Sequence, residues 1–464
     1  MNYKKRTESD TLGSIKIDNK RLWGAQTQRS LENFQIGNDK IPVELIIALG
    51  KQKKASAQAN MQFAILDKKI GKEIINACDQ IINLNLINEF PLSVWQTGSG
   101  TQTNMNANEV ISNYAIKKLN GKIGSKKPVH PNDHVNLSQS SNDTFPTIMH
   151  IAVNELTSNK LLPSLKNLIN EFRSKQLKYK NIIKIGRTHT QDATPITLGN
   201  EFSAFYSQID SCLKRIKLAK KELDFLAQGG TAVGSGINSP KNFDKVFCKY
   251  LNKITKNKYK PSKNKYEAIA SHDPLVNFSS SLKTLAIALI KITNDLRFLA
   301  SGPRSGIGEL IIPTNEPGSS IMPGKINPTQ IEALSMVCAQ VIGNSSAVDI
   351  GGLNGHFQLN AFKPLIAFNI IKSINLLSDA INSFNSNCLK GIKPNKKNIS
   401  NHLKNSLMLV TALNKSIGYD NAAKIAKAAL KNKTTLKTEA LKSGLINEKD
   451  YNKIVDPKKM IYPA

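Results

Sequence analysis

Residues 318–330 have the sequence Gly-Ser-Ser-Ile-Met-Pro-Gly-Lys-Ile-Asn-Pro-Thr-Gln, which places glycines, hydroxyls, a lysine and an amide immediately before a helical pattern. Asn327 suits the N-cap of that helix, Pro328 its first turn, and Gln330 the third position after the cap. Apolar residues then recur at helical spacing, at Ile331, Leu334, Cys338 and Ile342. The pattern predicts a mobile loop that leads into a long helix.

The start of this helix favours an anionic ligand. A helix N-terminus carries a partial positive charge and free N–H groups, and Lys325 stands beside it. We therefore expect a carboxylate or a phosphate to bind there. A surface loop rich in glycine and proline is the alternative interpretation, and it leaves the pairing of Lys325 with Asn327 at a capped helix start unexplained.

The composition is that of a globular protein. With 464 residues, 40% of them apolar, the chain can bury a large core divided over two or three domains. Its five cysteines lie far apart without a Cys-x-x-Cys pair, which argues against a disulfide framework and against a thiolate metal site. This cysteine usage fits a reducing compartment.

No targeting or membrane segment is expected. No uninterrupted apolar run approaches the ~20 residues of a spanning helix, and residues 1–10 have neither an apolar signal core nor a transit pattern. The formal net charge of +30 would by itself favour a nucleic-acid partner. The lysines are nevertheless scattered among Asn and Ile, as in residues 251–265, so we expect a cytoplasmic protein without nucleic-acid or membrane partners.

Three more polar clusters precede or interrupt helical patterns. They are residues 97–104, rich in hydroxyls, residues 139–143 with Ser140-Ser141-Asn142, and residues 186–195 with Thr188-His189. Such clusters often only cap helices, but donors gathered at a helix start can also bind an anion. A lone histidine is more often structural, yet it is the side chain that titrates nearest neutral pH, which suits a general acid or base.

Two other motifs are poor matches to common sites. His130 and His134 in residues 129–134 have no apparent third metal ligand. The glycine-rich residues 228–236 lack the Gly-Lys-Ser/Thr ending of a phosphate loop and follow a helical pattern, so a turn between helices is the better interpretation.

Several stretches resemble the fumarase/aspartase superfamily, whose members eliminate across a Cα–Cβ bond to release fumarate. Residues 318–330 resemble its signature, residues 139–143 its Ser-Ser-Asn motif, and residues 20–30 the opening of class II, iron-free, fumarases. The resemblance extends from about Asp10 to the C-terminal region. His189 makes this segment resemble a fumarase rather than the alternative, an aspartase-like ammonia-lyase, because the corresponding aspartase motif lacks a histidine at this position.

The resemblance implies the architecture. We expect an all-α fold in which a central bundle of long helices forms the core of a homotetramer with active sites shared between subunits. The expected domains are residues 1–138, 139–394 and 395–464. No metal or organic cofactor is implied, and the substrates would be the small dicarboxylates fumarate and L-malate of the tricarboxylic acid cycle.

The resemblance also implies the site residues. Ser319 would be the base and His189, oriented by Glu332, would handle the water. The substrate-binding residues would be Ser99, Gly100, Thr101, Ser140, Ser141, Asn142, Thr188, Ser320, Lys325, Ile326 and Asn327. A second, non-catalytic dicarboxylate site would comprise His130, Pro131, Asn132 and Asp133. His134 stands where many relatives carry an acid.

Overall fold

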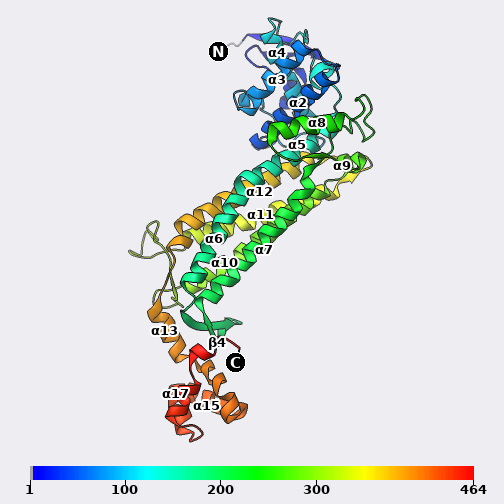
Figure 1. Ribbon diagram of the computed structural model, residues 1–464. Coiled ribbons are helices and arrows are strands. Elements are labelled where there is room, and N and C mark those ends of the chain that lie inside the picture. Colours follow the sequence, from blue (N-terminus) through cyan, green and yellow to red (C-terminus); the bar gives the residue numbers. More distant parts are fainter. Residues whose placement is uncertain (1–3, 464) are drawn as a thin grey trace. The chain divides into compact units, whose positions relative to one another are not determined.

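Helices dominate the computed structural model, which describes residues 4–463 (Figure 1). The prediction of an all-α fold is confirmed. The α-helices in this part of the chain are α1 (Ala25–Asn33), α2 (Val43–Gln62), α3 (Lys68–Ile82), α4 (Thr101–Lys118), α5 (Ser141–Leu156), α6 (Leu162–Lys178), α7 (Leu198–Lys220), α8 (Phe243–Thr255), α9 (Lys265–Ala270), α10 (Asp273–Leu299), α11 (Thr329–Leu353), α12 (Lys363–Asn387), α13 (Lys396–Asn405), α14 (Asn414–Ile417), α15 (Tyr419–Asn432), α16 (Leu436–Lys442) and α17 (Glu448–Ile454).

The strands of the described residues form only two-stranded sheets. They are β1 (Lys5–Asp10) with β2 (Gly13–Asp18), β3 (Ile183–Thr188) with β4 (Gln191–Thr197), β5 (Phe225–Leu226) with β6 (Lys260–Pro261), β7 (Leu310–Ile311) with β10 (Lys393–Pro394), and β8 (Gly355–His356) with β9 (Leu359–Asn360). All pairs are antiparallel except β5 with β6. The hairpins at residues 5–18 and 183–197 were not predicted from the sequence.

The chain divides into two compact units. The first comprises residues 1–163, 214–286 and 339–377, and the second comprises residues 164–213, 287–338 and 378–464. In the first unit α2 packs against α3, α5 and α8. Its core holds fully buried side chains such as Leu49, Ile111 and Phe145.

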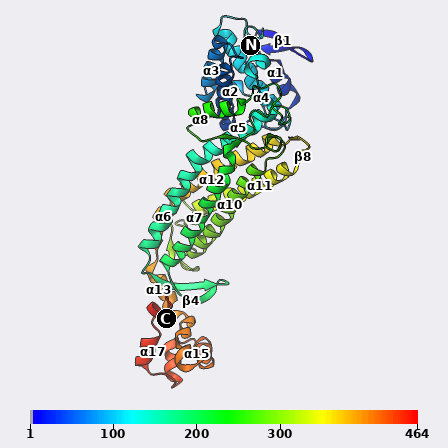
Figure 2. The same cartoon turned by 45° about the vertical axis from the view of Figure 1, so that its right-hand side comes forward.

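The helices α10, α11 and α12 run side by side (Figures 1 and 2). In the first unit Ser279 lies 3.3 Å from Ser345, oxygen to oxygen, and Asn344 donates to Ser373 over 3.1 Å. By length and composition alone, α10, α11 and Lys363–Gly391, which contains α12, could cross a membrane. The search for uninterrupted apolar runs in the sequence did not reveal them.

The second unit ends in short helices that pack against the β3–β4 hairpin. Ile185 of β3 is buried in the cluster that these helices form, and the other members of this cluster are Leu409, Val410, Leu413, Ala422, Ile425, Leu436, Ala440 and Tyr451. Burial of such apolar side chains stabilises by about 25 cal/mol per Å². The C-terminal helices therefore hold the hairpin that carries His189.

Candidate active site

The polar residues 99–101 begin helix α4. Gly100 has φ of 74°, and a Cβ placed on it would lie 2.1 Å from the ring of Phe145, so only glycine fits. The Ser99 and Thr101 hydroxyl oxygens lie 2.8 Å apart in a hydrogen bond. Their remaining hydrogen-bonding capacity and the partial positive charge at the N-terminus of α4 can receive a carboxylate.

The polar residues 140–142 begin helix α5 beside them. Ser140 caps α5 by accepting from the Asn142 N–H, 3.2 Å away. The Asn104 amide of α4 donates to the Ser141 hydroxyl over 2.9 Å. This bond, together with the Gly100–Phe145 contact, brings the two predicted clusters together at neighbouring helix N-termini.

The Asp143 side chain connects the start of α5 to the glycine-rich loop by hydrogen bonds. It is fully buried, and its carboxylate accepts from Ser140 N–H over 2.9 Å and from Gln228 Nε2, Gly229 N–H and Thr231 N–H at 2.9 to 3.0 Å. Burial raises the pKa of Asp143 to about 6, against the opposing effect of these donors, so the group is ionised at neutral pH. The glycine-rich loop is thus a turn pinned to α5, as its sequence predicted.

His189 lies at the tip of the β3–β4 hairpin, in a two-residue turn. His189 and Thr190 both have positive φ, 55° and 59°, which is the turn geometry whose twist matches a two-stranded hairpin. Neither residue is a glycine, so the turn stores strain, a property that often accompanies function. His189 is exposed at this tip.

A buried ion network holds the base of the same hairpin. The Lys184 ammonium lies 3.0 Å from carboxylate oxygens of both Glu201 and Glu309, and Arg187 donates to Glu309 over 2.8 Å. Burial by itself raises the pKa of Glu309, but the hydrogen bond and charge of Arg187, with the charge of Lys184, lower it overall. Because Glu309 is fully buried, it ties the hairpin to the segment that precedes β7.

The signature residues 318–327 form a loop that is largely exposed. The Ser319 hydroxyl oxygen accepts from the N–H groups of Ile321 and Met322, 3.2 and 3.0 Å away. Two such donors stabilise negative charge on that oxygen, which is the activation that a serine base requires. Lys325 and Ile326 line a cavity of about 220 Å³.

The predicted cap of α11 is wrong in detail. The Asn327 amide donates to the Gly318 carbonyl and closes the loop instead of capping the helix. The Pro328 carbonyl accepts from the Glu332 N–H over 3.0 Å, so the helix begins one residue later than predicted. Gln330 accepts from the Ser383 hydroxyl over 2.7 Å rather than closing a capping box.

The two units divide the predicted active-site residues. The first contains Ser99, Gly100, Thr101, Ser140, Ser141 and Asn142, and the second contains Thr188, His189, Ser319, Ser320, Lys325, Ile326, Asn327 and Glu332. The His189 and Glu332 side chains make no hydrogen bond or ion pair with any of residues 4–463. The pairing of these two side chains stays a prediction.

Residues 130–132 line a separate pocket in the first unit, and the predicted second-site residue Asp133 does not line it. His130 Nδ1 accepts from the N–H groups of Asn132 and Asp133, 3.2 and 3.1 Å away. Burial lowers the pKa of His130, which favours the neutral ring. His130, Pro131 and Asn132 line a cavity of about 330 Å³ together with Lys126, which the sequence analysis did not select. In residues 4–463 no group of three His, Cys, Asp or Glu could hold a metal ion.

Comparison with known proteins places the chain. Residues 13–343 match the family described as lyase, and residues 409–462 match the fumarase C C-terminus. A protein of Brucella suis named fumarate hydratase class II is 56% identical over 458 residues, with 99% of each chain covered. A Rickettsia bellii protein with the same name is 57% identical over 456 residues, with 98% of each covered.

Solved structures agree. A class II fumarase from Schistosoma mansoni has a TM-score of 0.97 at 42% identity, covering 99% of this chain and 100% of that one. A fumarate lyase:delta crystallin from Brucella melitensis, bound to cobalt, has a TM-score of 0.95 at 40% identity and the same coverage. The fold and these matches define a lyase. Within the lyases, the chain belongs to the class II fumarate hydratase family.

Proposed function

We propose that this protein catalyses the reversible hydration of fumarate to L-malate, a reaction of the tricarboxylic acid cycle. The observation that carries this function is the identity above 50% to proteins named fumarate hydratase class II, over nearly the whole of both chains. The polar helix starts of α4 and α5 provide the donors that a dicarboxylate substrate needs.

The proposed mechanism assigns a task to each cluster. Ser319 removes the proton from the carbon next to a carboxylate, and its two N–H donors stabilise the oxygen that takes part. The resulting enediolate carries two negative charges on that carboxylate, which Lys325, Asn327, Asn142 and Thr188 surround. His189, oriented by Glu332, protonates the departing hydroxyl or activates the attacking water. Loss of one hydrogen-bond donor to the reacting carboxylate typically lowers the rate by a factor of roughly 10² to 10³.

Assembly into a homotetramer with shared active sites completes the proposal. Large apolar side chains on α10 and α11 are more than half exposed in the single chain, namely Ile287, Phe298, Met336, Ile350 and Leu353. Large apolar side chains exposed on long helices are the kind of surface that a protein interface buries. Packing against other subunits would bury it and would bring His189 and Ser319 of different chains to one site.

Several finer assignments belong to the same proposal. Residues 1–138, 139–394 and 395–464 form its three domains, and the pocket at His130 and Lys126 is its second dicarboxylate site. The protein works in the cytoplasm without a metal cofactor. All five cysteines are free and buried, which suits a reducing compartment.

One assay tests the function against its alternatives. Fumarate absorbs in the ultraviolet, so its loss can be followed with and without ammonia and after treatment with a chelator. We expect loss without ammonia, formation of L-malate, and full activity after chelation. Turnover only with ammonia would establish the aspartase-like alternative, and inactivation by the chelator would overturn the metal-free mechanism.

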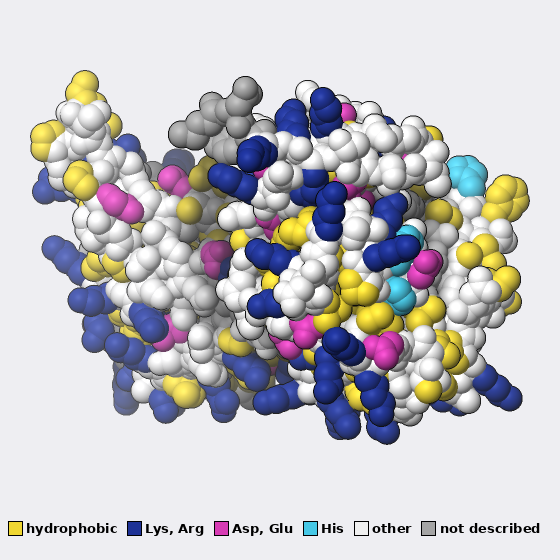
Figure 3. Space-filling model, turned by 90° about the horizontal axis from the view of Figure 1, so that it is seen from above, with side chains coloured by type: hydrophobic (Ala, Val, Ile, Leu, Met, Phe, Trp, Pro, Cys, Tyr) yellow, Lys and Arg dark blue, Asp and Glu magenta, His cyan; other side chains and the backbone are white. Residues whose placement is uncertain are grey.

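The alternative of nucleic-acid binding rests on charge alone. Lys and Arg side chains are dispersed over the face shown in Figure 3, with Asp and Glu among them, rather than gathered in one patch. Retention on DNA with a steep salt dependence, together with no lyase activity, would favour this alternative.

A further inference from the structure

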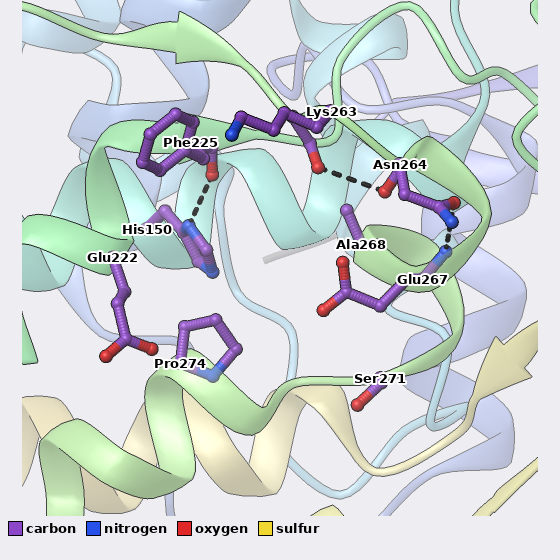
Figure 4. Close-up of a pocket in the computed structure, with 10 residues that line it drawn as sticks. His150, Glu222, Phe225, Lys263, Asn264, Glu267, Ala268, Ser271 and Pro274 are labelled. Carbon is purple, nitrogen blue, oxygen red and sulfur yellow. Dashed lines mark hydrogen bonds between the residues drawn. The ribbon is translucent and has the colours of Figure 1, made fainter.

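A second cavity in the first unit has no role in the proposed reaction. It has a volume of about 310 Å³ and lies between helix α5, the strand β5 and helix α9 (Figure 4). None of the proposed catalytic, substrate-binding or second-site residues lines it. The lining residues are His150, Glu222, Phe225, Ser262, Lys263, Asn264, Glu267, Ala268, Ser271 and Pro274.

His150 presents a hydrogen-bond acceptor to this cavity. Its side chain is only 8% exposed, and Nδ1 lies 2.9 Å from the Phe225 carbonyl oxygen, to which it can only donate. Burial lowers the pKa of His150 to about 4, so the ring is neutral and carries its single proton on Nδ1. Nε2 therefore holds a lone pair and faces the cavity in Figure 4.

The charges of the lining oppose those of the whole protein. Two carboxylates, Glu222 and Glu267, stand against one ammonium, Lys263, although the chain as a whole has a net charge of +30. The Glu267 carboxylate and the His150 ring face each other across the cavity in Figure 4. The remaining walls include the apolar side chains of Phe225, Ala268 and Pro274.

We propose that this cavity is a binding site for a small organic ammonium ion. One N–H of the ligand donates to His150 Nε2, and Glu267 and Glu222 balance its positive charge. The hydrocarbon part of the ligand packs against Phe225 and Pro274. An apolar cavity of this size with a few converging polar groups is the usual form of a small-molecule site.

Calorimetric titration with three probes of similar size separates the parts of the proposal. We expect n-butylammonium to bind saturably, at one equivalent per chain. Neutral pentan-1-ol should bind at least tenfold more weakly, because it lacks the charge. Tetramethylammonium, a cation without an N–H, should also bind more weakly, because it cannot donate to His150.

Two variants complete the test. Glu267→Gln should weaken n-butylammonium about tenfold or more, the size of a hydrogen bond to a charged group. Glu73→Gln on α3 removes the same charge away from the cavity and should leave the affinity unchanged. Absence of saturable binding, equal binding of pentan-1-ol, or equal effects of the two variants would each overturn the proposal. These titrations measure binding only, so their outcome is independent of the lyase activity.

Discussion

At the scale of single residues, Ser319 and His189 have different surroundings, but we expect substitution of either to have a similar effect on catalysis. Ser319 has two backbone donors on its oxygen, and His189 has an exposed ring at a strained turn. In the proposed mechanism both groups change charge only as the reaction proceeds. We therefore predict that Ser319→Ala and His189→Asn each lower kcat by orders of magnitude with little change in KM, measured in steady-state assays.

The histidine of the second site provides the control for this prediction. His130→Asn also exchanges an imidazole for an amide, but the change lies in a different pocket and should leave kcat close to that of the unaltered protein. If His130→Asn were as damaging as His189→Asn, the division into a catalytic and a second site would be wrong.

Glu309 should make the stability of the protein sensitive to acid. Its pKa in the folded state lies below the ordinary value of 4.5, so it contributes stability above that value and loses it as pH falls through the folded pKa. We predict that Glu309→Gln lowers the free energy of unfolding at pH 7 and flattens its dependence on pH below about 4.5. Urea unfolding at several pH values measures both effects.

The control for Glu309 is an exposed carboxylate. Glu448 in the second unit pairs with Lys437 at the surface, and Glu448→Gln should change stability little because exposed ion pairs contribute little. An equal loss of stability in the two variants at pH 7 would contradict the role given to the buried network.

At the scale of elements, we predict that a substitution in the turn of the β3–β4 hairpin can make the protein more stable. A non-glycine residue in the left-handed region costs roughly 1–2 kcal/mol, and Thr190 adopts it at φ of 59°. We predict that Thr190→Gly raises the free energy of unfolding by about 1 kcal/mol, measured by urea denaturation. Thr194→Gly, in the extended part of β4, should lower it, because glycine weakens a strand interior.

The same elements show what the sequence could and could not reveal. Helical periodicity located the long helices, and the polar clusters at residues 99–101 and 140–142 were correctly placed at helix starts, because caps and apolar spacing are local signals. The hairpin around His189 was missed, although residues 182–185 and 194–197 are rich in Ile and Thr on either side of two turn residues. The flanking helical patterns obscured this signal.

Other contributions come from residues distant in sequence. Glu309 meets Lys184 and Arg187 only in the folded chain, more than a hundred residues away, and no local pattern marks it. Lys126 is close to His130 in sequence and lines the same pocket, but one lysine in a lysine-rich chain is no local signal of a site. Asn327 was predicted to cap α11 from its residue type, but its bond to Gly318 across the loop prevailed.

At the scale of the whole molecule, the proposed sharing of active sites between subunits can be measured by subunit mixing. The inactive Ser319→Ala and His189→Asn chains are unfolded and refolded together in equal amounts. If the two residues of a site come from different chains, roughly a quarter of the sites receive both intact residues under random mixing. We predict that activity returns to about that fraction of the unaltered protein.

The formation of mixed tetramers must be confirmed in the same experiment, for example with chains of different mass. Activity that stays at the level of either parent, in spite of confirmed mixed tetramers, would place both residues of each site on one chain.

The burial of all five cysteines makes the protein suitable for site-selective labelling. Burial raises the pKa of the Cys248, Cys338 and Cys388 thiols to about 12, and that of Cys78 in the same direction, so the reactive thiolate is scarce at neutral pH. A single cysteine introduced at an exposed position should therefore react first with a maleimide. A fluorophore at exposed Thr190 would then report on the surroundings of His189, and so test the proposed substrate contact, without any removal of native cysteines.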